Sequence, residues 1–150
     1  PSEIQVEISD NTRHIKTDRE QIQKLVLHIC KKFSIDRALV SIAVEDDQQV
    51  IELNKKFLNR STATDVISFD LTENAEQTKC FDMVVNAQRA ARQAKKRKHS
   101  PQAELALYIT HGLLHNLGFD DLKTRQAELM HKKEDEILQE IGFGKIYDTD

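Results

Sequence analysis

The helix around which this chain is organised lies in residues 100–118, which read SPQAELALYITHGLLHNLG. Ser100 is a suitable N-cap residue, and Pro101 suits the first helical position because its missing amide hydrogen is not needed there. Apolar side chains then recur at steps of three and four residues, the spacing of one helical face. Gly118 follows the last of them and is typical of a helix C-terminus. The stretch therefore predicts a helix that ends at Gly118.

Two histidines lie near the end of this predicted helix. His111 and His115 are four residues apart, so their imidazoles share one helical face. Unpaired buried imidazoles are costly, whereas metal coordination satisfies them. Gly118 lets the chain reverse, which brings Asp121 back toward the same point. Catalytic zinc sites usually have three protein ligands and a fourth position for water. We therefore expect His111, His115 and Asp121 to bind one divalent ion, and this set of ligands indicates Zn²⁺.

The residue after the first histidine bears on the reaction class. In zinc proteases with an H-E-x-x-H motif, a glutamate at that position is the general base. Here the position is Gly112. Peptide hydrolysis is therefore disfavoured, although a metalloprotease stays open as a third possibility.

The remaining elements are indicated by hydrophobic periodicity. Four strands are expected at residues 4–8, 39–44, 66–71 and 81–85, the last two pairing as a hairpin. Further helices are expected at residues 18–33, where Asp18 is the N-cap, around 50–57, and at 86–98 and 124–141. The final helix is expected to bury Ala127, Met130, Ile137, Leu138 and Ile141. The order predicts a single α+β domain over residues 1–150, in which a small mixed sheet of about four strands packs with about five helices.

Composition narrows the functional classes. The 150 residues suit one domain, and the net charge of −3 does not attract polyanions, so contact with nucleic acid requires a local basic patch. No apolar run approaches the roughly 20 residues of a membrane span. Cys30 and Cys80 form no regular framework, and no signal peptide is apparent, so we expect reduced thiols and a cytoplasmic location.

Several other residues have two interpretations. The cations Arg89, Arg92, Lys95, Lys96, Arg97 and Lys98 form either an RNA-binding patch or, as the stronger interpretation, a solvated helix end. Asp65 and Asp82 are interpreted as turn, cap or supporting groups rather than as acids and bases. Cys30 lies on an apolar helical face and is interpreted as a core residue.

Residues 111–121, which read HGLLHNLGFDD, resemble the H-G-x-L-H-x-x-G-[YF]-D-H signature of the YbeY family of rRNA-maturation endoribonucleases. Leu53-Asn54 and residues 64–69, which read TDVISF, resemble two further stretches of that family. Asp82 stands where the family has G-D-I, and Glu104 where a glutamate begins the metal helix. The similarity extends over residues 40–142.

The resemblance implies a zinc-like site in an α+β fold with a small sheet backed by helices. It also implies a metal-dependent endoribonuclease that acts on single-stranded RNA in rRNA maturation and ribosome biogenesis. RNA and the ribosome are the expected partners, not DNA and not a membrane.

The chain departs from the family pattern at three positions. The third ligand is Asp121 instead of the usual histidine, which adds negative charge, weakens the ion as a Lewis acid and makes Mn²⁺ more competitive. Leu58 stands where the family has an arginine, and Arg60 is the candidate replacement. Phe81 replaces the glycine before Asp82. Leu58 and Asp121 favour the alternative of a non-catalytic, ribosome-associated metal-binding module.

Overall fold

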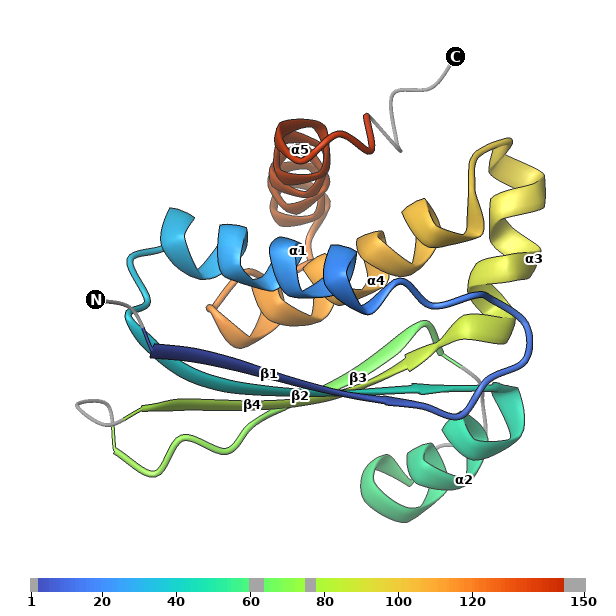
Figure 1. Ribbon diagram of the computed structural model, residues 1–150, viewed down its shortest axis with the longest axis horizontal. Helices are drawn as coiled ribbons and strands as arrows, with labels where there is room; N and C mark the ends of the chain where they lie inside the picture. The colour runs from blue at the N-terminus through green and yellow to red at the C-terminus, as the bar shows by residue number, and fades with distance from the viewer. Residues whose placement is uncertain (1–2, 60–63, 75–77, 145–150) are drawn as a thin grey trace.

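The computed structural model describes residues 3–59, 64–74 and 78–144. Within these residues one four-stranded sheet packs with helices, as the sequence predicts (Figure 1). The strands are β1 (Glu3–Asp10), β2 (Arg37–Glu45), β3 (Val66–Asp70) and β4 (Lys79–Asn86). The helices are α1 (Arg19–Lys32), α2 (Asp47–Leu58), α3 (Ala87–Arg97), α4 (Pro101–Asn116) and α5 (Thr124–Glu140). The predicted α+β class is confirmed.

The sheet has the order β1-β2-β4-β3 and is mixed. β2 is parallel to both β1 and β4, whereas β3 and β4 are antiparallel and form the expected hairpin pairing. Alternate residues of β2 are fully buried on the face that α1 and α4 cover, and the residues between them are half-buried on the opposite face. Helix α2 lies on that opposite face and leaves part of it open (Figure 1).

Helix α4 is buried along nearly its whole length because it contacts the sheet, α1, α3 and α5. It begins where the sequence predicts, since the Ser100 hydroxyl accepts a hydrogen bond from the Ala103 amide at 3.0 Å. It ends at a turn in which Gly118 has φ +99°, and the Phe119 amide donates to the Leu114 carbonyl at 3.0 Å. This turn redirects the chain toward α5.

The other expected boundaries agree with the structure to within two or three residues, and Asp18 caps α1 by accepting from the Gln21 amide. The expected core face of α5 is partly wrong. Met130, Ile137 and Leu138 are buried, but Ala127 is half-buried and Ile141 lies beyond the helix and is half-buried. Glu134 and Asp135 complete the buried set instead.

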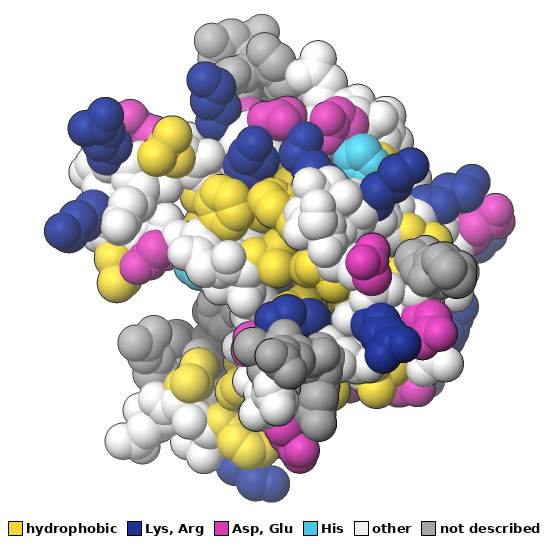
Figure 2. Space-filling model, turned by 90° about the vertical axis from the view of Figure 1, so that its left-hand side faces the viewer, with side chains coloured by type: hydrophobic (Ala, Val, Ile, Leu, Met, Phe, Trp, Pro, Cys, Tyr) yellow, Lys and Arg dark blue, Asp and Glu magenta, His cyan; other side chains and the backbone are white. Residues whose placement is uncertain are grey.

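Lys and Arg side chains are interspersed with Asp and Glu on the face shown in Figure 2, which agrees with the small net charge of −3. No helix in the described part of the chain is long and apolar enough to cross a membrane.

Candidate metal centre

The two histidines and the aspartate predicted from the sequence lie together at the end of α4. The Nε2 atoms of His111 and His115 are 3.0 Å apart, and Oδ2 of Asp121 lies 3.5 Å from the first and 3.7 Å from the second. A tetrahedral zinc ion with bonds of about 2.0–2.1 Å has ligand atoms about 3.3–3.4 Å apart. The three donor atoms therefore have the spacing and the chemistry of a three-ligand metal site, and they are the one such group found among the described residues.

The third donor reaches this position because the chain reverses at Gly118. Asp120 stabilises the loop, since its Oδ1 accepts hydrogen bonds from the amides of Asp121 and Leu122. The side chain of Asp121 is 36% exposed, and that of His115 is 32% exposed. The group is thus accessible from solvent on the side of this loop.

The more deeply placed candidate ligand, His111, is held by a residue that sequence reasoning missed. Its Nδ1 lies 3.1 Å from Oε2 of Glu134, a side chain with no exposed surface on the inner face of α5. A carboxylate there accepts from the Nδ1–H group, which leaves the Nε2 lone pair free to face Asp121. A carboxylate that orients a metal-binding histidine in this way is a common supporting feature of metal sites.

Burial and this contact shift the pKa values of both His111 and Glu134. Burial raises the pKa of Glu134, and the hydrogen bond with His111 offsets that rise only in part. Burial alone would lower the pKa of His111, but its hydrogen bond and charge interaction with Glu134 raise the pKa overall. The Glu134 carboxyl therefore makes the His111 ring more basic, which strengthens it as a donor to a cation.

Gly112 allows α4 to approach the sheet closely at the metal centre. A Cβ atom at this position would lie 3.0 Å from Cγ2 of Val66 and 3.5 Å from Cβ of Ser68, both in β3. Gly112, whose presence in the sequence disfavours a protease, thus also has a role in packing. Any side chain at position 112 would require the Val66 side chain to shift.

We expect Gly112→Ala to lower the free energy of unfolding by about 1 kcal/mol, because overpacking costs about 1–3 kcal/mol and better helix propensity returns about 1 kcal/mol. In a Val66→Ala background the same substitution should become stabilising, since the obstructing methyl group is gone. Urea denaturation of the four proteins measures both effects. An equal effect of Gly112→Ala in both backgrounds would show that contact with Val66 is unimportant.

The other candidate residues lie elsewhere or have supporting roles. Asp65 accepts hydrogen bonds from the Val66 amide at 2.8 Å and the Thr64 hydroxyl at 3.2 Å, which agrees with its interpretation as a turn, cap or supporting group. Leu58 is the last residue of α2 and is 45% exposed, whereas Arg60 lies outside the described residues. Phe81 is buried and fills the core beneath α4.

The two cysteines are free thiols. Cys30 is buried, and burial raises its pKa to about 11, so the thiol stays protonated and unreactive at neutral pH. Its expected role as a core residue is confirmed.

The basic run of α3 is partly neutralised by acidic partners. Arg92 pairs with Asp47 at 2.6 Å, and Arg97 lies 3.5 Å from the buried carboxylate of Glu104. Glu104 also contacts His99 at 2.6 Å. These pairs join α3 to α2 and to the start of α4. They agree with a structural role for these cations in preference to an RNA-binding patch.

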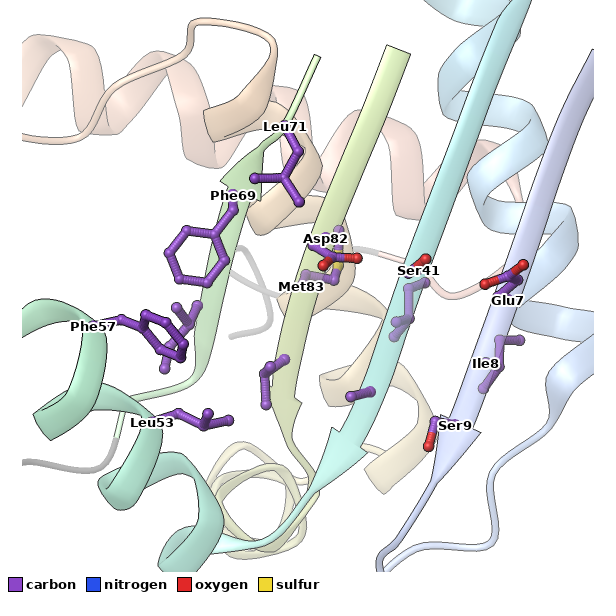
Figure 3. Close-up of a pocket in the computed structure, with 14 residues that line it drawn as sticks. Glu7, Ile8, Ser9, Ser41, Leu53, Phe57, Phe69, Leu71, Asp82 and Met83 are labelled. Carbon is purple, nitrogen blue, oxygen red and sulfur yellow. The ribbon is translucent and has the colours of Figure 1, made fainter. Parts of the chain in front are cut away.

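A separate cavity of about 640 Å³ lies on the open face of the sheet, where it extends across all four strands and against α2 (Figure 3). Leu53, Phe57, Phe69 and Leu71 form its apolar wall, and the carboxylates of Asp82 in β4 and Glu7 in the edge strand β1 line the remainder. None of the three donor residues lines it. Apolar walls and two carboxylates do not suit a phosphate backbone, so the metal centre is the better candidate for RNA chemistry.

Comparison with known proteins agrees with this geometry. Residues 5–142 match the model of the family described as Endoribonuclease YbeY. The endoribonuclease YbeY of Bacillus velezensis is 30% identical over an alignment 150 residues long, which covers 92% of this chain and 96% of that protein. The endoribonuclease YbeY of Carboxydothermus hydrogenoformans is 36% identical over 105 residues, 70% of this chain and 73% of that protein.

A Thermotoga maritima protein solved in solution has the same fold. It superposes with a TM-score of 0.60 at 20% identity, with 98% of this chain and 97% of that chain covered. The match of the family model over most of the chain, together with the relatives of similar length, shows that this chain belongs to the endoribonuclease YbeY family.

Proposed function

We propose that this chain is a metal-dependent endoribonuclease that cuts single-stranded RNA in the maturation of ribosomal RNA, with His111, His115 and Asp121 holding one divalent ion. The observation that carries the proposal is the convergence of two imidazole nitrogens and a carboxylate oxygen within 3.0–3.7 Å of one another. Membership of the endoribonuclease YbeY family supports RNA as the substrate. An enzyme that matures rRNA acts on ribosomes or their precursors, so we infer that this protein acts in the cytoplasm.

When bound, the ion supplies Lewis acidity toward a phosphodiester oxygen and lowers the pKa of water. The protein supplies the position of the donors. His111 is oriented by Glu134, His115 lies one turn further on the same buried helix, and Asp121 contributes a harder oxygen donor than an imidazole. The ligand set fits Zn²⁺, and the oxygen of Asp121 makes Mn²⁺ competitive.

The test uses the wild-type chain purified without chelator. We expect one divalent ion per chain by elemental analysis, and cleavage of a single-stranded RNA but not of the same sequence in a duplex. A chelator should abolish cleavage, and either Zn²⁺ or Mn²⁺ should restore it, because the donor set accepts both ions.

Two results would contradict the proposal. Equal cleavage by metal-free and metal-loaded protein would separate the metal centre from the reaction. Tight metal binding without cleavage of any RNA would favour the non-catalytic, ribosome-associated module, for which the exposed Leu58 in place of an arginine is the structural indication.

A further inference from the structure

Two cations lie beside the metal centre and have no partner within the described part of the protein. Lys123 and Arg125 are exposed, two and four residues after Asp121, at the start of α5. Neither side chain makes a hydrogen bond or an ion pair with any described residue. They are therefore available to an anionic ligand.

Their position relative to the metal centre is fixed by the chain itself. Two residues span at most about 7 Å, so the backbone of Lys123 lies within that distance of Asp121, and Arg125 within about twice that distance. The long side chains of lysine and arginine extend this reach to the groups next to a bound phosphodiester.

Two exposed lysines at the C-terminal end of α3, Lys95 within it and Lys98 just after it, are much further away. They lie beside the start of α4, and His111 is ten residues after Pro101, which corresponds to about 15 Å along the helix. Figure 1 shows α3 and the end of α4 at opposite ends of the molecule. Lys95 and Lys98 therefore match Lys123 and Arg125 in charge and exposure but not in place.

The local charge shows what these two cations offset. Asp120 and Asp121 put two carboxylates at the rim of the metal centre, and the whole chain carries a net charge of −3. Acidic and basic side chains are mixed on the face shown in Figure 2, and that face carries no broad basic surface. An RNA strand that reaches the metal centre needs cations at the same place.

We propose that Lys123 and Arg125 bind a phosphate of the RNA strand next to the phosphodiester that is cut. This inference rests on the proposed function, and it assigns the strand a path over the loop at residues 117–123 and the start of α5. The pair positions the substrate and takes no part in bond cleavage.

The test compares the double variant K123Q/R125Q with the charge-matched control K95Q/K98Q. We measure kcat and KM for a single-stranded RNA at several salt concentrations. For K123Q/R125Q we expect KM to rise at least about tenfold with kcat changed less. The slope of log(kcat/KM) against log[salt] should become shallower by about 0.7, because the pair neutralises one phosphate and each lost phosphate contact on a single strand removes about 0.7. The control should keep the wild-type slope.

Similar changes in both double variants would overturn the inference, because a general effect of net charge would then explain them. If the wild-type protein cuts no RNA, the proposed function fails, and fluorescence anisotropy with the same RNA and Zn²⁺-loaded protein decides the inference separately. Weaker binding of K123Q/R125Q alone would support the phosphate site, and unchanged binding would refute it.

Discussion

His115→Ala is expected to abolish RNA cleavage with little loss of stability, whereas His111→Ala is expected to abolish cleavage and also to destabilise the fold. Each substitution removes one of three donors. Since loss of a supporting residue around a metal site already costs about 10–100-fold in affinity or activity, loss of a donor should cost more than about 100-fold in kcat/KM. The two variants differ in whether a buried carboxylate is left without its histidine partner.

The difference arises from Glu134. His111→Ala deprives this fully buried carboxylate of its partner at 3.1 Å, and an uncompensated buried charge costs about 3–5 kcal/mol. His115 is 32% exposed, and its contacts with described residues include no buried carboxylate, so His115→Ala should unfold close to the wild-type temperature in metal-free buffer. Thermal unfolding with EDTA, alongside cleavage assays, measures both quantities. Equal stability of the two metal-free variants would contradict this account of the buried pair.

The second large effect is expected at Glu134 itself. Glu134→Leu should weaken Zn²⁺ binding about 10–100-fold, because His111 loses the acceptor that fixes its ring orientation. The stability of the metal-free protein should change by less than about 2 kcal/mol, because removal of a buried carboxyl group is favourable whereas the Nδ1–H group of His111 loses its acceptor. A residue with a purely structural role would not separate the two measurements in this way.

Glu134→Gln and Glu136→Gln are the controls. The amide oxygen introduced by Glu134→Gln can still accept from the Nδ1–H group of His111, so the affinity of this variant for Zn²⁺ should lie between wild type and Glu134→Leu. Glu136 is on the same helix, pairs with Lys32 at 2.8 Å and lies apart from the metal centre, so its neutralisation should leave affinity unchanged. Competition with a chromophoric chelator gives the dissociation constants. An affinity of Glu134→Leu equal to wild type would refute the positioning role.

The convergence of His111, His115 and Asp121 was predictable to a large extent because the three residues lie close together in the sequence. A four-residue step on a helix, followed by a glycine reversal, depends on local geometry alone, and the structure brings Asp121 within 3.7 Å of both rings. Glu134 was missed because it lies 23 residues from His111. The sequence did contain an indication of its role, because Glu134 is a charged residue on the apolar helical face formed by Met130, Ile137 and Leu138.

The arrangement of the strands was harder to predict for the same reason. The hairpin of β3 and β4 follows from neighbouring runs, but the insertion of β4 between β2 and β3 depends on contacts between distant segments. The pairing of Arg92 with Asp47 and of Arg97 with Glu104 likewise requires the tertiary structure. Periodicity defines which face of an element is apolar, but it does not identify the partner of that face.

The three donors are anchored very differently, and this has a kinetic consequence. The two imidazoles belong to a helix enclosed by the sheet and by α1, α3 and α5, whereas Asp121 belongs to a solvent-facing loop whose hydrogen bonds to Asp120 are local. Opening of an exposed loop requires much less free energy than displacement of a core helix. We therefore expect the proposed ion to enter and leave on the Asp121 side, at an exchange rate limited by how often that loop opens.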